Sequence, residues 1–132
     1  MVKSLRSAAL AALFPLILTL AACAGGGMYA AAPAKVMDGA LTGANGMTLY
    51  TFDKDAAGSG KSLCNGPCAT NWPPLFAMDS DMASGDYSIV MRDDGKKQWA
   101  FKGKPLYYWN KDQKPGDRTG DGFNNVWHTA KP

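Results

Sequence analysis

One seven-residue stretch occurs twice in the sequence, and this duplication constrains the fold more than any other feature. Residues 49–55 and residues 106–112 both read Leu-Tyr-x-aromatic-x-Lys-Asp, and a Trp follows each copy at a similar distance. Self-similarity of this kind indicates a chain assembled from repeated structural units. The sequence therefore predicts two related β units, repeat 1 at about residues 35–76 and repeat 2 at about residues 87–131.

Each copy has the composition of a short strand whose aromatic side chains form one face. Tyr, Phe, Trp and Thr favour a pleated backbone, and successive side chains of a strand point to opposite sides. Tyr50 therefore shares a face with Phe52, and Tyr107 shares the matching face with Trp109. We expect these rings to be core residues. A paired aromatic surface for a ligand is the alternative.

The Asp that ends each copy and the Trp that follows it also have a structural interpretation. Asp favours turns because its carboxylate bonds to the backbone that follows. A buried Tyr hydroxyl requires a hydrogen-bond partner, and Asp55 and Asp112 are candidates for that role. Trp72 and Trp127 close the two repeats, and we expect them to be structural as well.

The composition favours a single small all-β domain, an antiparallel sheet or sandwich over residues 35–132. The 132 residues suffice for one domain. All 11 acidic residues are Asp, and 15 Gly and 8 Pro accompany them. Because Asp, Gly and Pro disfavour helix interiors, the composition argues against a helical bundle. The formal net charge is +3, and without the two basic residues of the leader it is about +1, from 12 basic and 11 acidic side chains. That balance is too even for electrostatic binding of nucleic acid, which needs a concentrated basic face.

The first 22 residues have the pattern of a bacterial lipoprotein signal peptide. Two basic residues precede an apolar run, residues 8–20, which has signal-peptide length and is too short to span a bilayer. The run ends in Leu-Ala-Ala-Cys, which resembles the lipoprotein box and predicts lipidation of Cys23. Ala24 follows the Cys, and by the same resemblance this favours an outer-membrane location facing the periplasm.

A flexible linker is expected between the lipid and the folded domain. Residues 23–34 are rich in small side chains and lack any periodicity. Several acyl chains would hold the protein on the bilayer, since each buried methylene contributes about 0.8 kcal/mol. We expect no cofactor apart from the covalent lipid on Cys23.

Two hairpins are predicted from turn residues that lie between apolar segments. Asn45-Gly46 suits the positive φ angles of a tight turn between strands over residues 35–41 and 47–52. Asp93-Asp94-Gly95 separates strands over residues 87–92 and 97–102. Further strands are expected over residues 105–110 and 126–128.

Together these residues resemble a family of bacterial predicted lipoproteins with a Tyr-x-(Phe/Trp/Tyr)-x-x-Asp motif, whose members are described as secreted repeats of unknown function. The motif fits at residues 50–55 and again at residues 107–112. The Cys-x-x-x-Cys that precedes Trp-Pro-Pro also follows the family pattern. The resemblance covers about residues 35–130. It implies an envelope location and a repeated unit, and it implies no activity.

Cys64 and Cys68 are predicted to form a disulfide. Two close thiols in an exported protein normally oxidise, and Asn-Gly-Pro between them supports a tight turn. A redox-active pair is the alternative. It has less support, because the spacing is not the Cys-x-x-Cys of thioredoxin-like proteins and no βαβ pattern surrounds it.

Metal binding is a second alternative. Cys64, Cys68 and His128, with the methionines, are soft ligands that suit Cu(I), but Met is also ordinary core filling. Asp112, Asp117 and Asp121 could supply oxygen ligands to Ca²⁺. Their spacing does not match an EF-hand, so solvated turn residues are the simpler interpretation.

Enzymatic hydrolysis has little support in the sequence. There is no Gly-x-Ser-x-Gly and only one His, and a hydrolase would need Asp55 or Asp112 to converge on His128. We therefore expect a non-enzymatic binding or structural module of the envelope, whose partner is a small ligand, a glycan or an envelope protein. The alternative is a periplasmic redox or copper-handling protein that uses Cys64 and Cys68.

Overall fold

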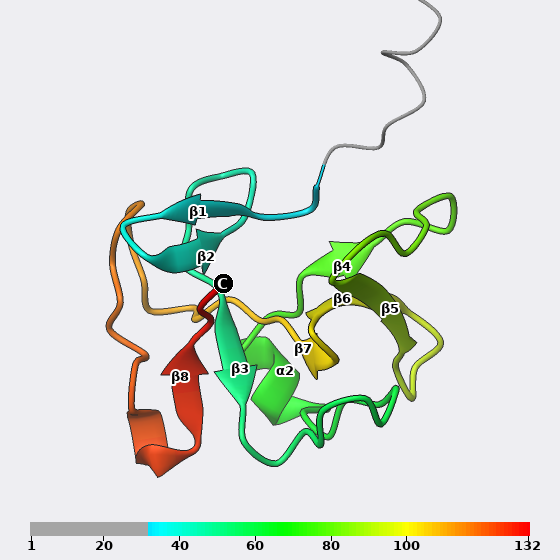
Figure 1. Cartoon of the computed structure of the whole chain (residues 1–132). Coiled ribbons are helices and arrows are strands. Elements are labelled where there is room, and N and C mark those ends of the chain that lie inside the picture. Colours follow the sequence, from blue (N-terminus) through cyan, green and yellow to red (C-terminus); the bar gives the residue numbers. More distant parts are fainter. Residues whose placement is uncertain (1–31) are drawn as a thin grey trace, which may run out of the picture. The chain divides into compact units, whose positions relative to one another are not determined.

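The protein is described by a computed structural model that covers residues 32–132. The expected signal peptide, Cys23 and residues 24–31 of the expected linker lie outside the described residues. Among the residues described, no helix has the length and apolar character needed to cross a membrane. Its regular secondary structure is mostly strand, in small antiparallel sheets, as the composition predicts. Its elements are β1 Lys35–Met37, β2 Ala40–Thr42, β3 Tyr50–Phe52, α2 Pro67–Asn71, β4 Phe76–Ala77, β5 Tyr87–Met91, β6 Lys97–Phe101, β7 Lys104–Pro105, η1 Phe123–Asn125 and β8 Trp127–Thr129 (Figure 1).

Two hairpins precede the two copies of the repeated stretch. The predicted hairpin of β5 and β6 is confirmed, with Gly95 at φ 83° in its turn. The turn predicted at Asn45-Gly46 is also present, since the amide of Gly43 donates to the carbonyl of Met47 at 3.0 Å and Gly46 has φ 79°. The strand expected over residues 35–41 differs from expectation, because the chain also reverses inside it. Asp38 and Gly39 both have positive φ, 49° and 77°, so β1 and β2 pair across a two-residue turn of the kind that suits strand twist.

The two copies of the repeated stretch lie side by side at the centre of the domain. The amide of Tyr50 donates to the carbonyl of Tyr107 at 2.7 Å, and the amide of Tyr107 donates back to the carbonyl of Tyr50 at 2.9 Å. β8 pairs with the other edge of β3, and Pro74 forms a bridge to the other side of Tyr107. The two repeats are therefore related by an approximate two-fold axis between Tyr50 and Tyr107.

On each side of the domain, three backbone segments close a ring of hydrogen bonds. The amide of Leu41 donates to Ala130, the amide of Ala130 donates to Leu49, and the amide of Leu49 donates to Leu41, all at 2.8–2.9 Å. A ring with the same order of donors and acceptors is formed in the other half by Trp99, Leu75 and Leu106.

The third segment of each ring comes from the other half of the chain. Ala130 belongs to the second half but closes the ring of Leu41 and Leu49, and Leu75 belongs to the first half but closes the ring of Trp99 and Leu106. The repeats therefore exchange their last segments, and neither of them closes its own sheet.

Two buried clusters hold these segments together. The aromatic cluster consists of Tyr50, Cys64, Trp72, Tyr107, Trp109 and Trp127. The aliphatic cluster consists of Ala34, Leu41, Leu49, Leu106 and Ala130. The alternation predicted along the repeated stretch explains this division, because each Tyr points into the aromatic cluster and the Leu before it into the aliphatic one. Ala34 is buried, so the packed body begins one residue inside the expected linker.

Candidate functional site

The Tyr and Asp residues of the motif pair across the repeats. The hydroxyl of Tyr50 donates to Oδ2 of Asp112 at 2.6 Å, and the hydroxyl of Tyr107 donates to Oδ2 of Asp55. Both Tyr side chains are fully buried and both Asp residues are nearly so. Each motif thus supplies the Tyr of one pair and the Asp of the other.

The two carboxylates are also held by the loops that follow them. Asp55 accepts from the amide of Leu63 at 2.7 Å, and Asp112 accepts from the amide and the hydroxyl of Thr119 at 3.0 and 2.6 Å. Burial, followed by the bond to its Asp, raises the pKa of each of the hydroxyls of Tyr50 and Tyr107 far above the ordinary value. Burial also raises the pKa of Asp55. The Tyr and Asp side chains of the motif therefore use their hydrogen-bonding groups within the protein and have a structural role.

Four aromatic rings stack in a row through the aromatic cluster. Trp72 and Trp127 lie at its centre with ring centroids 3.9 Å apart. Phe52 stacks on the outer face of Trp127 at 4.3 Å, and Trp109 stacks on that of Trp72 at 3.9 Å. Each ring is followed by a ring from the other repeat, so the stack repeats the exchange seen in the backbone. Offset or edge contacts of this kind contribute about 0.5–1.5 kcal/mol each beyond burial.

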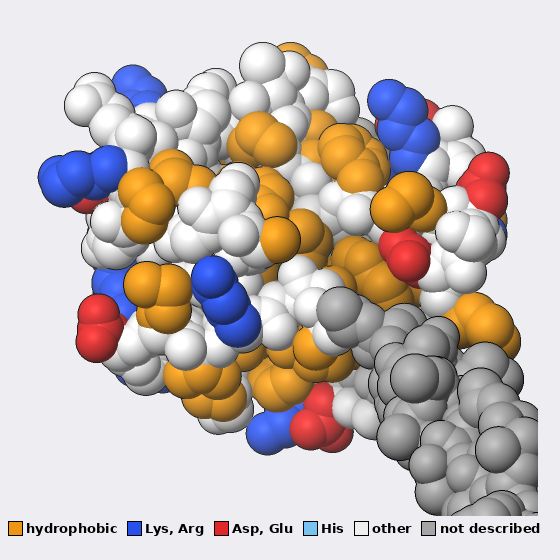
Figure 2. Space-filling model, turned by 90° about the horizontal axis from the view of Figure 1, so that it is seen from above, with side chains coloured by type: hydrophobic (Ala, Val, Ile, Leu, Met, Phe, Trp, Pro, Cys, Tyr) orange, Lys and Arg blue, Asp and Glu red, His pale blue; other side chains and the backbone are white. Residues whose placement is uncertain are grey.

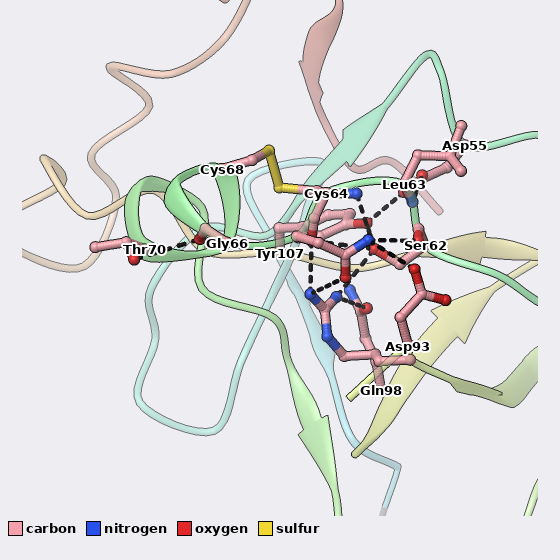
Figure 3. Close-up of a disulfide and its surroundings, with 12 residues drawn as sticks. Asp55, Ser62, Leu63, Cys64, Gly66, Cys68, Thr70, Asp93, Gln98 and Tyr107 are labelled. Atoms are coloured by element: carbon pink, nitrogen blue, oxygen red, sulfur yellow. Dashed lines mark hydrogen bonds between the residues drawn. A yellow bond between two sulfur atoms is a disulfide. The ribbon is translucent and has the colours of Figure 1, made fainter. Parts of the chain in front are cut away.

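The predicted disulfide between Cys64 and Cys68 is confirmed (Figure 3). It joins the loop after the first motif to α2, a five-residue helix with Pro67 at its first turn. Cys64 is fully buried in the aromatic cluster. The disulfide therefore fixes the approach of the chain to Trp72.

A buried Arg that the sequence analysis did not single out supports this loop. Arg92 lies at the end of β5, and its guanidinium donates to the hydroxyl of Ser62 at 2.9 Å, to the side-chain oxygen of Gln98 at 2.7 Å and to the carbonyl of Cys64 at 2.5 Å. The Ser62 hydroxyl in turn contacts that of Tyr107 at 2.6 Å (Figure 3). Alternation along the strand, with Val90 buried, is the signal that could have revealed it.

Each candidate metal ligand is bonded to a different partner within the protein. The sulfurs of Cys64 and Cys68 are bonded to each other, and His128 is paired with Asp53. In the candidate calcium loop, Asp117 accepts from nearby backbone amides and Asp121 accepts from the amide of Thr129, which lowers the pKa of both carboxyls. Within residues 32–132 no three His, Cys, Asp or Glu side chains form a group that could hold a metal ion.

An open groove of about 460 Å³ lies over the outer face of β3 and β8. Tyr50 and Phe52 point into the aromatic cluster, so alternation turns Thr51 outward, and its register partner His128 is turned outward beside it. The turn between β6 and β7 forms one wall. We call this the His128 groove; its lining is Thr51, Asp53, Phe101, Lys102, Lys104, Asp121, His128, Thr129, Ala130 and Lys131.

The acidic groups of the His128 groove are engaged, whereas its lysines are not. Nε2 of His128 lies 2.7 Å from Oδ2 of Asp53, and the two side chains are 46% and 50% exposed. Asp121 accepts from the Thr129 amide at 2.9 Å. Three cationic side chains of the groove form no ion pair with any described residue; they are Lys102, Lys104 and Lys131.

The comparison with known families finds two matches to the family described as a secreted repeat of unknown function, over residues 34–76 and residues 88–131. The chain belongs to this family. The family's description as secreted indicates an extracellular or envelope location, and the two matches coincide with the two halves that exchange their last segments. No match was found among curated proteins or among solved structures.

Proposed function

We propose that the chain is a non-enzymatic binding module of the cell envelope, anchored at the periplasmic face of the outer membrane by lipid on Cys23, and that its His128 groove binds a small anionic ligand. The pattern of residues 1–23 and the secreted character of the family support the location. The observation that carries the binding role is the groove itself, in which lysines without ion-pair partners surround the His128–Asp53 pair.

The charges of the groove favour an anion over a neutral ligand. Asp53 is engaged by His128 and Asp121 by the Thr129 amide, so the acidic oxygens are already bonded. The lysines keep their donors for a ligand, and the three of them outnumber the two Asp of the lining, so the groove carries a net positive charge that attracts anions. A carboxylate or phosphate group is therefore the expected recognition element.

Exposure of the His128–Asp53 pair favours binding over catalysis. About half of each side chain faces water, where the electrostatic effect of one charge on another is weak. Catalytic groups act mostly in sites that exclude water. The motif carboxylates Asp55 and Asp112 are buried in bonds to Tyr hydroxyls, and neither bonds to His128.

A redox role for the disulfide has less support. Thiol–disulfide exchange requires a thiolate to reach one of the sulfurs. Cys64 is fully buried and Cys68 is partly buried against the aromatic cluster. Slow reduction of the folded protein by a small thiol supports the structural role, and rapid reversible reduction supports the redox alternative.

Ligand titration tests the binding role. Inorganic phosphate, citrate and a neutral trisaccharide are titrated into the protein while the amide signals of Thr51 and His128 are followed by NMR. We expect both anions to move these signals and the trisaccharide to leave them unchanged. Equal responses to the anions and to the trisaccharide, or none, would remove the anionic ligand from the proposal.

Two sets of lysines give a matched control. The triple variant Lys102→Ala, Lys104→Ala, Lys131→Ala removes the unpaired cations of the groove. Its counterpart changes three exposed lysines that do not line the groove: Lys54, Lys61 and Lys111. We expect the first variant alone to lose anion binding, because its charges are local to the site. Equal losses would indicate only a response to net charge.

Fractionation of cells tests the anchor. Cys23→Ser removes the thiol that would carry the lipid, so the variant is expected to leave the membrane fraction and to lose incorporated labelled fatty acid. Retention of the variant in the outer membrane would contradict the anchor and leave the groove unaffected.

A further inference from the structure

The exposed apolar side chains of the domain gather on the side where the chain enters it. Five of the eight large apolar side chains exposed in residues 32–132 belong to β1 or to β4 and the loop after it. Met78 is 70% and Met82 is 76% exposed. We call these five the entry surface: Val36, Met37, Phe76, Met78 and Met82.

The first described residues lie directly against this surface. Pro33 lines a hollow together with Phe76 and Met78, and β1 starts two residues later. In Figure 1, β1 and β4 both lie at the upper end of the domain. Figure 2 views this end from above and shows hydrophobic side chains spread across it.

We propose that the entry surface docks on the lipid bilayer that carries the acylated Cys23. This inference rests on the lipid anchor of the proposed function. Ala32 lies nine positions after Cys23 in the chain, and nine residues span at most about 30 Å. The acyl chains therefore keep the entry surface close to the bilayer at all times, and such tethering raises the effective concentration of a weak contact.

The composition of the entry surface suits the interfacial region of a bilayer. Met and Phe side chains present apolar area that gains from leaving water, and Met adapts to an irregular neighbour. Nζ of Lys96 lies over the Phe76 ring at 5.5 Å, with its charge free to remain among polar headgroups.

Charge contributes little to this contact. Lys97 pairs with Asp79 at 3.7 Å, and Asp81 lines the hollow beside Met78. Positive and negative side chains are therefore balanced, unlike the basic clusters that select anionic lipids. Docking is expected to be as strong on neutral as on anionic vesicles and to be insensitive to salt.

A fluorescent label reports whether the surface meets lipid. In the processed chain, Cys23 is acylated and Cys64 and Cys68 are bonded, so Met78→Cys introduces one free thiol for an environment-sensitive dye. Leu63→Cys is the control, because Leu63 is also exposed and apolar but follows Asp55 in the loop at the opposite end of the domain (Figures 1 and 3).

The acylated variants are reconstituted into vesicles of phosphatidylethanolamine and phosphatidylglycerol, three to one, and into phosphatidylcholine vesicles. We expect the Met78 label to shift to the blue and to be quenched by nitroxide-bearing acyl chains in both vesicles, and the Leu63 label to behave as in water. A Met82→Cys label repeats the test should the first variant be unstable.

Flotation with the vesicles distinguishes the lipid anchor from docking of the entry surface. A chain that floats with the vesicles while both labels remain in water overturns docking and preserves the anchor. A chain that does not float overturns both. A blue shift of the Met78 label that grows with protein concentration in vesicle-free buffer assigns the surface to a second copy of the chain and also overturns docking.

Discussion

Trp72 and Trp127 lie face to face, with ring centroids 3.9 Å apart and ring planes only 3° apart. They occupy equivalent positions in the two repeats, and each also packs against the Tyr of its own repeat's motif. Trp72 contacts Tyr50 edge-on at 5.3 Å, and Trp127 contacts Tyr107 edge-on at 5.0 Å. The approximate two-fold axis therefore passes through a stack in which every layer joins the halves of the chain.

The exchange of segments predicts that neither half folds alone. A fragment of residues 32–83 lacks Ala130, Trp127 and Asp112, and a fragment of residues 84–132 lacks their counterparts. Each alone leaves a buried Tyr and an open ring of backbone groups without partners. We expect near-UV circular dichroism to show no fixed aromatic packing in either fragment, and mixing at equal concentration to restore the signal of the intact chain. A folded monomer of either fragment would contradict the exchange.

A double-mutant cycle tests the crossed pairing of Tyr and Asp. Tyr50→Phe leaves Asp112 without one donor, and we expect it to lower the free energy of unfolding by about 1–3 kcal/mol. In the double variant with Asp112→Asn, the loss of unfolding free energy should be smaller than the sum of the two single losses by at least about 0.5 kcal/mol, because both changes remove the same interaction.

Tyr50→Phe with Asp55→Asn is the control for that cycle, since no hydrogen bond joins these residues and their losses should add within about 0.5 kcal/mol. Urea denaturation measures all variants. The opposite pattern, with coupling to Asp55, would show that each motif pairs within itself.

The buried hydroxyls predict alkaline unfolding. Both Tyr50 and Tyr107 have a folded-state pKa raised by burial and by the neighbouring Asp, whereas the unfolded chain ionises near pH 10. Below pH 10 the phenols are neutral in both states and their contribution is intact. Above pH 10 only the unfolded state loses protons, so the free energy of unfolding falls by about 1.4 kcal/mol per pH unit for each such Tyr.

Phenolate absorbance followed against pH should therefore show two of the tyrosines ionising together with loss of structure. Tyr107→Phe removes one of the two buried hydroxyls, so the free energy of unfolding should fall about half as steeply with pH above pH 10. Ionisation of all tyrosines near pH 10 with the fold intact would contradict the burial of these groups.

Local pattern was sufficient to predict the class of the fold and much of its core. Period-two alternation placed Tyr50 and Phe52 on one side of β3, and the duplicated stretch revealed the two units. The crossed pairing of Tyr and Asp between the repeats could not be predicted, because the sequence is equally compatible with a hydrogen bond between Asp55 and either Tyr. The choice depends on the backbone pairing of Tyr50 with Tyr107, a contact between residues far apart in the chain.

The His128 groove was also invisible in the sequence. The sequence makes His128 a candidate metal ligand with Cys64 and Cys68, or a candidate catalytic group with Asp55 or Asp112, whereas its partner in the structure is Asp53. That pairing follows from the register of β3 against β8, in which Thr51 opposes His128. The lysines of the groove come from the turn after β6 and from the last residues of the chain. No local sequence pattern indicates that these two segments lie close together.

The disulfide contributes less than its place in the aromatic cluster implies, because repeat 2 folds over the same stack without one. There Gly120 lies beside the stack, and an added Cβ would stand 2.7 Å from Cη2 of Trp72. The bond closes a loop of only four residues' separation, for which chain entropy gives about 2 kcal/mol. We expect Cys64→Ala with Cys68→Ala to lower the free energy of unfolding by about 2 kcal/mol and to preserve the near-UV spectrum. Gly120→Ala should cost about 1–3 kcal/mol by overpacking and should alter that spectrum. Loss of folding in the double alanine variant would show that the first repeat depends on a bond for which the second has no counterpart.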